Sequence, residues 1–298
     1  MVAILWRTIT PMGCVVRIIW LQNTLFVKLK CHSVGLLDQL WGNRNLQFLF
    51  EKLQSVSLLG MNYGRASDYG NNGEARMLEK VGSIVGTAKT ILFDVGANQG
   101  EFTRHILEAW GGMSYRVYAF EPSKKTFEML RMSIEVSPFV HLYNIGFGER
   151  PDHVQLYYDR EGSGLASIYP RDLSHRNIEF TDHETIELTT LDIFCQQHEI
   201  DSIDYLKMDV EGHELAVLKG AKKLFEQQKI KIVQFEFGGC NIDSRTYFRD
   251  YYNFFKKDFK LFRILSNGLR PINSYSEKLE VFQSANYLAI RNDLAFFV

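Results

Sequence analysis

The stretch Ile91-Leu92-Phe93-Asp94-Val95-Gly96-Ala97-Asn98-Gln99-Gly100-Glu101-Phe102 decides the fold prediction for this chain. An apolar segment ends in Asp94-Val95, a loop with two glycines follows, and apolar residues then recur at helical spacing. A strand, a tight turn and a helix in this order form the opening unit of a nucleotide-binding α/β sheet. Gly96 allows a sharp turn beneath a ligand, and the first N–H groups of the helix can bind an anion. Because Gly-x-x-x-Gly is common by chance, the prediction depends on the segments that follow.

Beyond residue 90 the predicted strands and helices alternate, which favours a parallel sheet with helices on both faces. Strands are expected at Tyr115–Phe120, Phe139–Ile145, Ile203–Met208 and Ile230–Phe237, and two closing strands at Lys260–Leu265 and Ala285–Arg291. Helices are expected at Leu46–Leu59, Glu74–Val85, Lys124–Val136 and Asn241–Phe259. The loop from Met61 to Gly73 is rich in glycine and asparagine, so we divide the chain into residues 1–60 and 61–298.

Composition bounds the function. The 298 residues are 46% hydrophobic, enough to bury a full core. A net charge of −1 gives no general attraction to nucleic acid, so no nucleic-acid partner is expected. The four cysteines, Cys14, Cys31, Cys195 and Cys240, have no C-x-x-C spacing and are interpreted as reduced thiols of a cytoplasmic protein.

Residues 1–37 carry four basic side chains and no acidic one among many apolar residues. Arg17 interrupts the only long apolar run, so no membrane span is predicted, and no small-residue cleavage site marks a secretory signal. One interpretation is a pair of amphipathic helices that pack on the body of the protein or on a second subunit. The other is a basic, tryptophan-bearing helix that lies on a membrane surface.

Glu121 follows the second predicted strand, 25 residues after Gly96. A carboxylate at this point can accept hydrogen bonds from both hydroxyls of a ribose. It can instead bond the N–H groups of the next helix, although Ser123 can fill that role. Gly146 and Gly148 either leave room for a flat ring or form a simple turn. The stretch Asp159–His183 is too long for an ordinary connection and is expected to be a lid, a substrate wall or a mobile segment. Tyr169 in this stretch can stack on a sugar or pack in the core.

The second informative stretch is Lys207-Met208-Asp209-Val210-Glu211-Gly212-His213-Glu214. Asp209 lies at the carboxyl end of a predicted strand, and the acids after it lie where a helix begins. Glu236 ends the next strand in the same way. In an open α/β sheet this edge binds ligands.

Together these segments resemble the FkbM family of S-adenosylmethionine-dependent methyltransferases. The resemblance covers the chain from about Gly73 onward, and Asp209-Val210-Glu211-Gly212-x-Glu214 is its most specific part. It implies a Rossmann-like class I methyltransferase sheet of seven strands, with the last two forming an antiparallel hairpin. Residues 1–60 lie outside it and are expected to be a helical extension.

The resemblance also implies a cofactor, S-adenosylmethionine, and an acceptor, a hydroxyl of a saccharide or hydroxylated metabolite. N–H groups after Gly96 would hold the carboxylate of the donor, Asp94 its amino group or nearby water, and Glu121 its ribose. Residues 144–146 would flank its adenine. The full set of candidate donor-site residues is Asp94, Gly96, Ala97, Asn98, Gly100, Phe102, Glu121, Pro122, Asn144, Ile145, Gly146 and Asp209.

An acceptor hydroxyl is a poor nucleophile, so a base or a metal is expected beside it. Asp209 is the first candidate base, Glu211, His213 and Glu236 follow, and Lys207 is expected to orient Asp209 or the substrate. In a second scheme Asp209, Glu211 and Glu236 hold a Mg²⁺ ion. His213 also has a plain interpretation as an exposed residue in the first turn of a helix.

Two other classes of function stay open at this point. A nicotinamide-dependent oxidoreductase would use the same glycine loop, but Asn98 replaces its middle glycine and nothing in that chemistry needs the residues from Asp209 to Glu214. A non-catalytic interaction protein could keep the fold and have lost turnover.

Overall fold

The computed structural model describes residues 7–9, 15–21, 24–30, 40–66, 69–85, 90–110, 114–135 and 137–294. The chain divides into two compact units, Met1–Leu58 and Leu59–Val298. None of the helices in these described ranges has both the length and the apolar composition needed to cross a bilayer. Of the four cysteines, the structure describes Cys195 and Cys240, which are buried thiols without a disulfide.

The first unit contains a three-stranded antiparallel sheet, β1 (Arg7–Ile9), β2 (Val15–Leu21) and β3 (Thr24–Lys30). The predicted helices are therefore wrong for these ranges, and the rest of residues 1–37 lies outside the described residues. Val15, Val16, Ile18 and Ile19 are β-branched, which favours a strand over a helix. The prediction that this segment contacts a membrane surface or a second subunit stays a prediction.

Helix α2 (Gln47–Gly60) is the helical part of the N-terminal region, and the short 3-10 turn η1 (Arg44–Leu46) precedes it. The predicted helix at Leu46–Leu59 is confirmed. No residue of α2 is buried, and Phe48, Leu49, Leu53 and Val56 are exposed.

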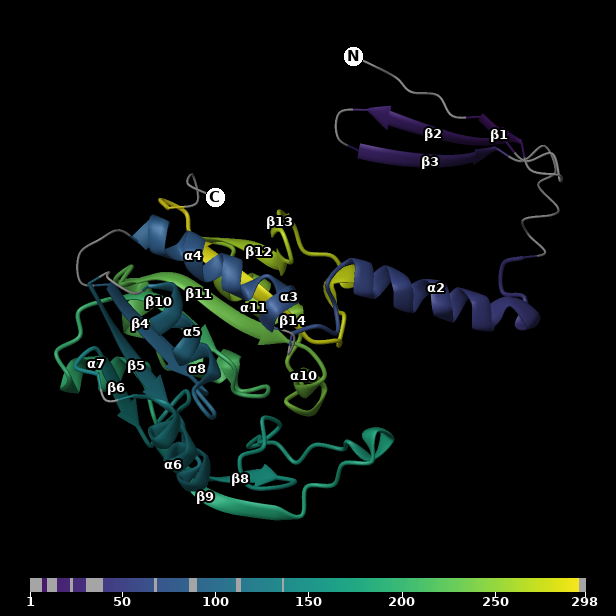
Figure 1. Ribbon diagram of the computed structural model, residues 1–298. Helices are drawn as coiled ribbons and strands as arrows, with labels where there is room; N and C mark the ends of the chain where they lie inside the picture. The colour runs from purple at the N-terminus through teal and green to yellow at the C-terminus, as the bar shows by residue number, and fades with distance from the viewer. Residues whose placement is uncertain are drawn as a thin grey trace. The chain divides into compact units, whose positions relative to one another are not determined.

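The second unit is organised around one eight-stranded sheet with the order β13-β12-β14-β11-β10-β4-β5-β6 (Figure 1). Its strands are β4 (Thr90–Val95), β5 (Tyr115–Phe120), β6 (Val140–Tyr143), β10 (Ile203–Met208), β11 (Ile230–Phe237), β12 (Phe259–Leu265), β13 (Gly268–Ile272) and β14 (Ala285–Arg291). Strands β6, β5, β4, β10 and β11 run parallel, and β14 pairs antiparallel with both β11 and β12. The predicted fold class is confirmed. The eighth strand arises because the chain after Gly268 folds back on β12 as an edge strand.

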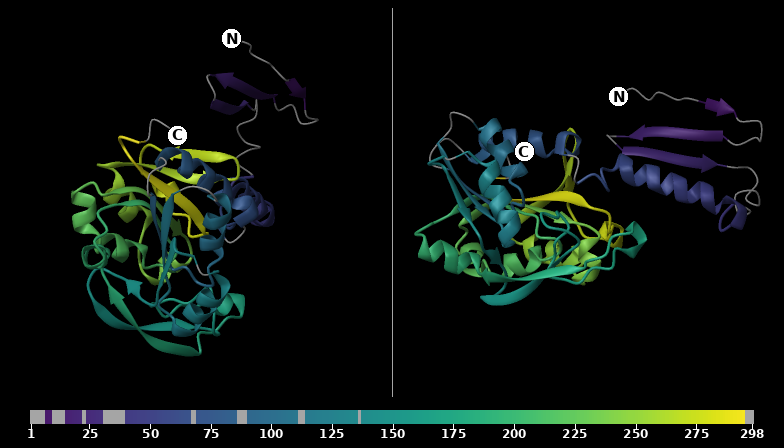
Figure 2. Two further views of the ribbon diagram at one scale, coloured as in Figure 1. Left: turned by 60° about the vertical axis from the view of Figure 1, so that its left-hand side comes forward. Right: turned by 60° about the horizontal axis from the view of Figure 1, so that its bottom comes forward.

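Helices cover both faces of this sheet (Figures 1 and 2). On one face lie α4 (Glu74–Val85), α5 (Glu101–Ala109) and α6 (Lys124–Ser133), whose apolar residues pack on β4 and β5 through Leu92, Val117 and Ala119. On the other face Phe194 of α7 (Leu191–Gln197) contacts Phe93, and Tyr251 of α11 (Phe248–Phe255) stacks on Phe235. The remaining helices of this unit are α3 (Tyr69–Asn72), α8 (Glu214–Lys219), α9 (Lys222–Glu226), α10 (Cys240–Asp243), η2 (Ser174–Arg176) and η3 (Glu277–Leu279).

The single helix predicted at Asn241–Phe259 is instead two helices, α10 and α11. Arg245 between them has a positive φ of 55°, which breaks the helical path. The helix predicted at Lys124–Val136 ends at Ser133.

A small second sheet lies beside the carboxyl ends of the main strands, with β9 (Asp182–Thr189) between β7 (Gly146–Phe147) and β8 (Asp152–Tyr158). The predicted strand Phe139–Ile145 therefore ends two residues early, at Tyr143, and the chain enters β7. Residues 159–181 join β8 to β9 and form the predicted long insertion, which we call the insertion below.

Candidate active site

A pocket opens at the carboxyl edge of the sheet, where β4 has β5 on one side and β10 on the other. In open α/β sheets ligands bind at such a reversal of strand order. Seven predicted donor-site residues line the pocket: Gly96, Asn98, Glu121, Pro122, Ile145, Gly146 and Asp209. Glu211 and His213 line it as well, and residues 163–168 of the insertion form another wall. We call this the edge pocket.

Gly96 has a φ of +78°, and a Cβ atom there would lie 1.9 Å from the carbonyl oxygen of Asp209. The two strand ends are in direct backbone contact, since the Asp209 N–H donates to the Val95 carbonyl at 3.0 Å. Asn98 has a φ of +48°, and its buried Oδ1 has no hydrogen-bond partner among the described residues. Only glycine fits position 96, and Asn98 brings an unpaired acceptor to the pocket wall.

Glu121 has one of its two predicted roles, the bonding of N–H groups at the start of the next helix, and its contact with a ribose stays a prediction. Its carboxylate accepts from the N–H of Asn98 and from the N–H of Ser123, each at 3.0 Å, while Ser123 caps α6. Burial raises the pKa of Glu121 to about 7, although the two N–H donors lower it. Glu121 thus fastens the glycine loop to the next helix and also lines the edge pocket.

Asp94 lies beneath the loop rather than in the pocket. It is fully buried, accepts from the Thr103 hydroxyl at 2.7 Å, and lies 3.3 Å from the Lys207 ammonium. Lys207 also lies 3.7 Å from Asp209 and over the ring of Phe102. Burial alone would lower the pKa of Lys207. The negative charges of Asp94 and Asp209 have the opposite and larger effect, so the pKa is raised. The ammonium therefore holds Asp209, whose side chain is 42% exposed, at the pocket wall.

The other predicted donor-site residues do not line the pocket. Ala97, Gly100 and Phe102 are buried in the loop and in α5. The amide of Asn144 donates to the carbonyl oxygens of Glu121 and Pro122, both at 2.9 Å. These residues support the backbone that forms the pocket, and a direct contact with a donor stays a prediction for them.

The turn after β10 is braced from within. Glu211 and Gly212 have φ values of +51° and +102°. The buried carboxylate of Glu214 accepts from the N–H groups of Val210 and Gly212, at 3.0 and 3.3 Å, and from the Tyr251 hydroxyl. Glu214 is therefore a structural brace of this turn.

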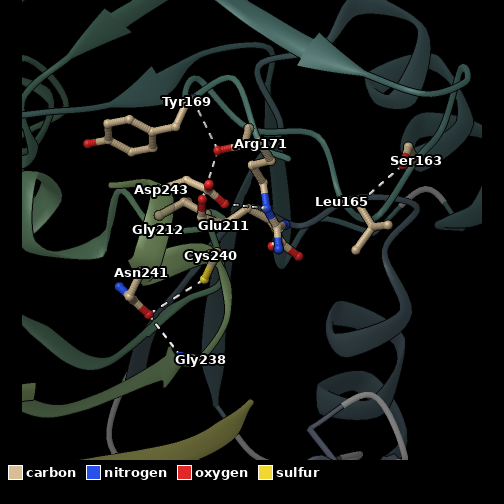
Figure 3. A network of polar contacts seen from close by, with 12 residues as sticks. Ser163, Leu165, Tyr169, Arg171, Glu211, Gly212, Gly238, Cys240, Asn241 and Asp243 are labelled. Carbon is tan, nitrogen blue, oxygen red and sulfur yellow. Dashed lines mark hydrogen bonds and ion pairs between the residues drawn. The ribbon is translucent and has the colours of Figure 1, made fainter. Parts of the chain in front are cut away.

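The insertion is fastened to the same turn through a residue that the sequence did not reveal, Arg171. Its Nη1 donates to the Glu211 carboxylate at 2.5 Å, and its Nε lies 3.5 Å from the Asp243 carboxylate (Figure 3). The Ser167 hydroxyl donates to the Glu211 carbonyl at 2.8 Å. Burial and the charge of Asp209 raise the pKa of Glu211 to about 8 in spite of Arg171. A lone arginine in a polar loop carries no sequence signal that marks this role.

His213 lies at the junction of the turn and the insertion. Its Nδ1 lies 2.9 Å from the Tyr169 hydroxyl, and burial lowers its pKa to about 4. The imidazole is therefore neutral near pH 7. It can exchange one hydrogen bond with a ligand but is a weak base.

The structure gives no support for Mg²⁺ at Asp209, Glu211 and Glu236. Within the part of the chain that the structure describes, no group of three or more His, Cys, Asp or Glu side chains is arranged to hold a metal. Glu211 is already engaged by Arg171, and Glu236 is a half-buried acid whose pKa is raised by burial and by the charges of Asp209 and Glu211.

The residues that form the edge pocket and the turn after β10 all lie within the range matched by one protein family. The family model described as "Methyltransferase FkbM domain" matches residues 94–261, more than half of the chain. The chain belongs to the FkbM methyltransferase family. The matched residues include the Gly96 loop, Glu121 and the turn after β10, so the resemblance inferred from the sequence is confirmed.

Individual relatives of this FkbM chain are distant. The 2-O-methyltransferase NoeI of Sinorhizobium fredii is 22% identical over 151 residues, which is 47% of this chain and 61% of NoeI. The chain thus spans less than two thirds of that relative. An FkbM methyltransferase structure from Methylobacillus flagellatus KT has a TM-score of 0.41 at 18% identity, over 67% of this chain and 43% of that one. An O-methyltransferase from Bacillus cereus in complex with SAH has a TM-score of 0.41 at 12% identity, over 79% of this chain and 89% of that one.

Proposed function

We propose that this FkbM protein transfers a methyl group from S-adenosylmethionine to a hydroxyl of a saccharide or hydroxylated metabolite. The observation that carries the proposal is the edge pocket, where Gly96, Glu121 and Asp209 meet at the reversal of strand order. Membership of the family supports the same reaction class.

The residues of the edge pocket suit the chemistry of such a donor. Its polar wall offers the unpaired Oδ1 of Asn98 and the carboxyl group of Glu121 to an amino group and to ribose hydroxyls. Its apolar wall includes Pro122, Ile145 and Gly146, where a Cβ on Gly146 would lie 2.6 Å from a Leu188 methyl group. The missing side chain at residue 146 lets Leu188 and Pro122 pack directly on its backbone, and these apolar side chains form the wall. When bound, the donor would supply an electrophilic methyl group on a sulfonium.

The protein side of the reaction is then positioning, removal of one proton and exclusion of water. Asp209 accepts the proton of the acceptor hydroxyl, since it is the carboxylate of the pocket wall with a half-exposed side chain held by Lys207. Four residues of the insertion line the pocket, Ser163, Gly164, Ala166 and Ile168, and in this proposal they limit the access of water to it. His213 is neutral and binds the acceptor rather than taking its proton.

Replacing Asp209 with Asn tests this assignment. The variant should still bind S-adenosylhomocysteine measurably in calorimetry, and should lose at least about 100-fold in the transfer of labelled methyl groups to a panel of saccharides and hydroxylated metabolites. NADH should bind neither protein. Asp201→Asn is the matched control, because Asp201 lies just before β10 and its side chain is fully exposed. Turnover near the wild-type rate in Asp209→Asn would exclude the base assignment, and failure of the wild type to bind S-adenosylhomocysteine would exclude the donor.

A further inference from the structure

A much larger cleft adjoins the edge pocket. It has a volume of about 1260 Å³ and is formed by the segment after β7, the insertion, α8 and the α10–α11 region. Ile168, Leu188 and His213 line both the cleft and the edge pocket, so the two spaces meet at these residues. We call this space the side cleft.

We propose that the side cleft binds the methyl acceptor, and that this acceptor is an uncharged chain of several sugar units whose terminal unit reaches His213. This inference rests on the proposed function and adds a location, a length and a charge to its acceptor.

The volume of the side cleft sets the length. Pockets for single small molecules measure about 300–1000 Å³. The side cleft, at about 1260 Å³, exceeds that range before any space of the edge pocket is added. A single sugar ring would leave most of it filled with water, whereas several linked rings would follow it from α11 to His213.

The charges that line the side cleft favour an uncharged ligand over a strongly charged one. Three basic residues and three acidic residues contribute to its wall: Arg150, Lys219, Arg245, Glu149, Asp152 and Asp250. Two of the basic residues already face acids, with Lys219 3.8 Å from Glu149 and Arg150 3.7 Å from Asp152. The balance gives no net potential to attract a phosphorylated chain or a nucleic acid.

The remaining wall suits a ligand with apolar faces and hydroxyl edges. The half-buried rings of Tyr169 and Phe254 lie among amide, hydroxyl and charged side chains, including Asn253 and Ser244. Sugar rings present this combination, because their C–H faces pack on aromatic rings while their hydroxyls donate and accept hydrogen bonds. A lipid chain would leave the polar groups of this wall without partners.

His213 connects the side cleft to the edge pocket. Its Nδ1 is engaged by the Tyr169 hydroxyl, and its Nε2 faces Gly148, where a Cβ atom would lie 3.1 Å away. Gly148 therefore keeps space beside this nitrogen. A sugar hydroxyl pairs with Nε2 in either neutral tautomer, because it can both donate and accept.

The test measures saccharide binding to the protein loaded with S-adenosylhomocysteine. The probes are series of one to six units, each built from one neutral sugar, and their phosphorylated counterparts. We expect the affinity to rise at least about tenfold from one unit to four in one neutral series. Arg245→Gln and Asn253→Ala, which change exposed residues of the cleft wall, should each lower the affinity for the tetramer by at least about tenfold without changing the affinity for S-adenosylhomocysteine.

Arg249→Gln is the matched control, since it removes an exposed guanidinium of α11 outside the cleft wall. Equal binding of one and four units, tighter binding of the phosphorylated series, absence of saccharide binding, or cleft variants that behave like the control would each overturn the inference. Titrations are repeated without S-adenosylhomocysteine. A protein that binds the neutral tetramer but not S-adenosylhomocysteine refutes the proposed donor and leaves the cleft assignment supported.

Discussion

Replacing Lys207 with Met removes a cation that lies beside both Asp94 and Asp209 in the centre of the sheet. Methionine keeps most of the side-chain volume and deletes the ammonium. Asp94 has no exposed surface, and among the described residues its side chain would then keep only the hydrogen bond from Thr103. We expect this variant to lose about 3–5 kcal/mol of unfolding free energy, as is usual when one partner of a buried ion pair is deleted.

The geometry gives a magnitude of the same order. Two unit charges separated by the 3.3 Å between Lys207 and Asp94 attract by about 5 kcal/mol at an effective dielectric constant of about 20. Desolvation of both groups offsets much of that attraction in the intact pair. The loss in Lys207→Met therefore comes mainly from the carboxylate left buried without its cation, and Asp94→Asn in the same chain should restore at least about 2 kcal/mol.

Urea denaturation followed by circular dichroism measures these free energies, with Lys231→Met as the matched control. Lys231 lies 2.6 Å from Asp204 on the neighbouring strand, but it is 31% exposed where Lys207 is 9% exposed, and Asp204 keeps the N–H of Ile91 as a donor. The control should lose only about 1 kcal/mol. The reasoning is refuted if both lysine variants lose the same amount, or if the double variant is as unstable as the sum of its two single changes.

Two more predictions concern Gly96, directly after β4, and the buried carboxyl group of Glu74. Gly96→Ala should weaken binding of S-adenosylhomocysteine by more than about 100-fold in calorimetry, because its Cβ would meet the Asp209 carbonyl at 1.9 Å, whereas Gly60→Ala, with open space around it, should bind normally. Burial raises the pKa of Glu74 to about 7 from an ordinary 4.5, and Lys207 and the amide donors only partly oppose this. Between these pH values the folded state keeps a proton that the unfolded state releases, so this group lowers stability as pH rises, by up to about 1.4 kcal/mol per pH unit. Glu74→Gln should therefore make the unfolding free energy fall less steeply between pH 5 and pH 7, by up to about 1.4 kcal/mol per pH unit. A slope equal to that of the wild type would contradict the raised pKa of Glu74.

The positions of Gly96, Glu121 and Asp209 could be predicted from the sequence because parallel strands end at the same edge of their sheet. Each of these residues follows an apolar run directly, so the alternation of strands and helices alone brought them together. The order of the strands and helices was therefore enough to predict that these three residues lie close together.

Pairings between strands and loops could not be predicted in the same way. Lys207 lies opposite Asp94 in the register of β10 and β4, and no sequence pattern gives that register, so Asp94 was expected to face the donor. Arg171 and Glu211 are 40 residues apart. The insertion that carries Arg171 has no periodicity, so its contact with the turn after β10 could not be predicted. The helices expected in residues 1–37 are strands where the structure describes them. The apolar pattern of this segment is compatible with a helix or a strand, and its β-branched residues favour the strand.

Three side chains of the insertion, those of Ser167, Tyr169 and Arg171, end on the turn that carries Glu211 and His213. A swap of this insertion between family members would therefore disturb the edge pocket as well as the wall of the side cleft. In chimaeras that exchange only the insertion, we expect the turn after β10 to be displaced, because it loses these three contacts. A chimaera should instead exchange the insertion together with the turn after β10 and with Asp243, which Arg171 contacts. Such a chimaera would keep the contacts between the insertion and the turn while the wall of the side cleft changes.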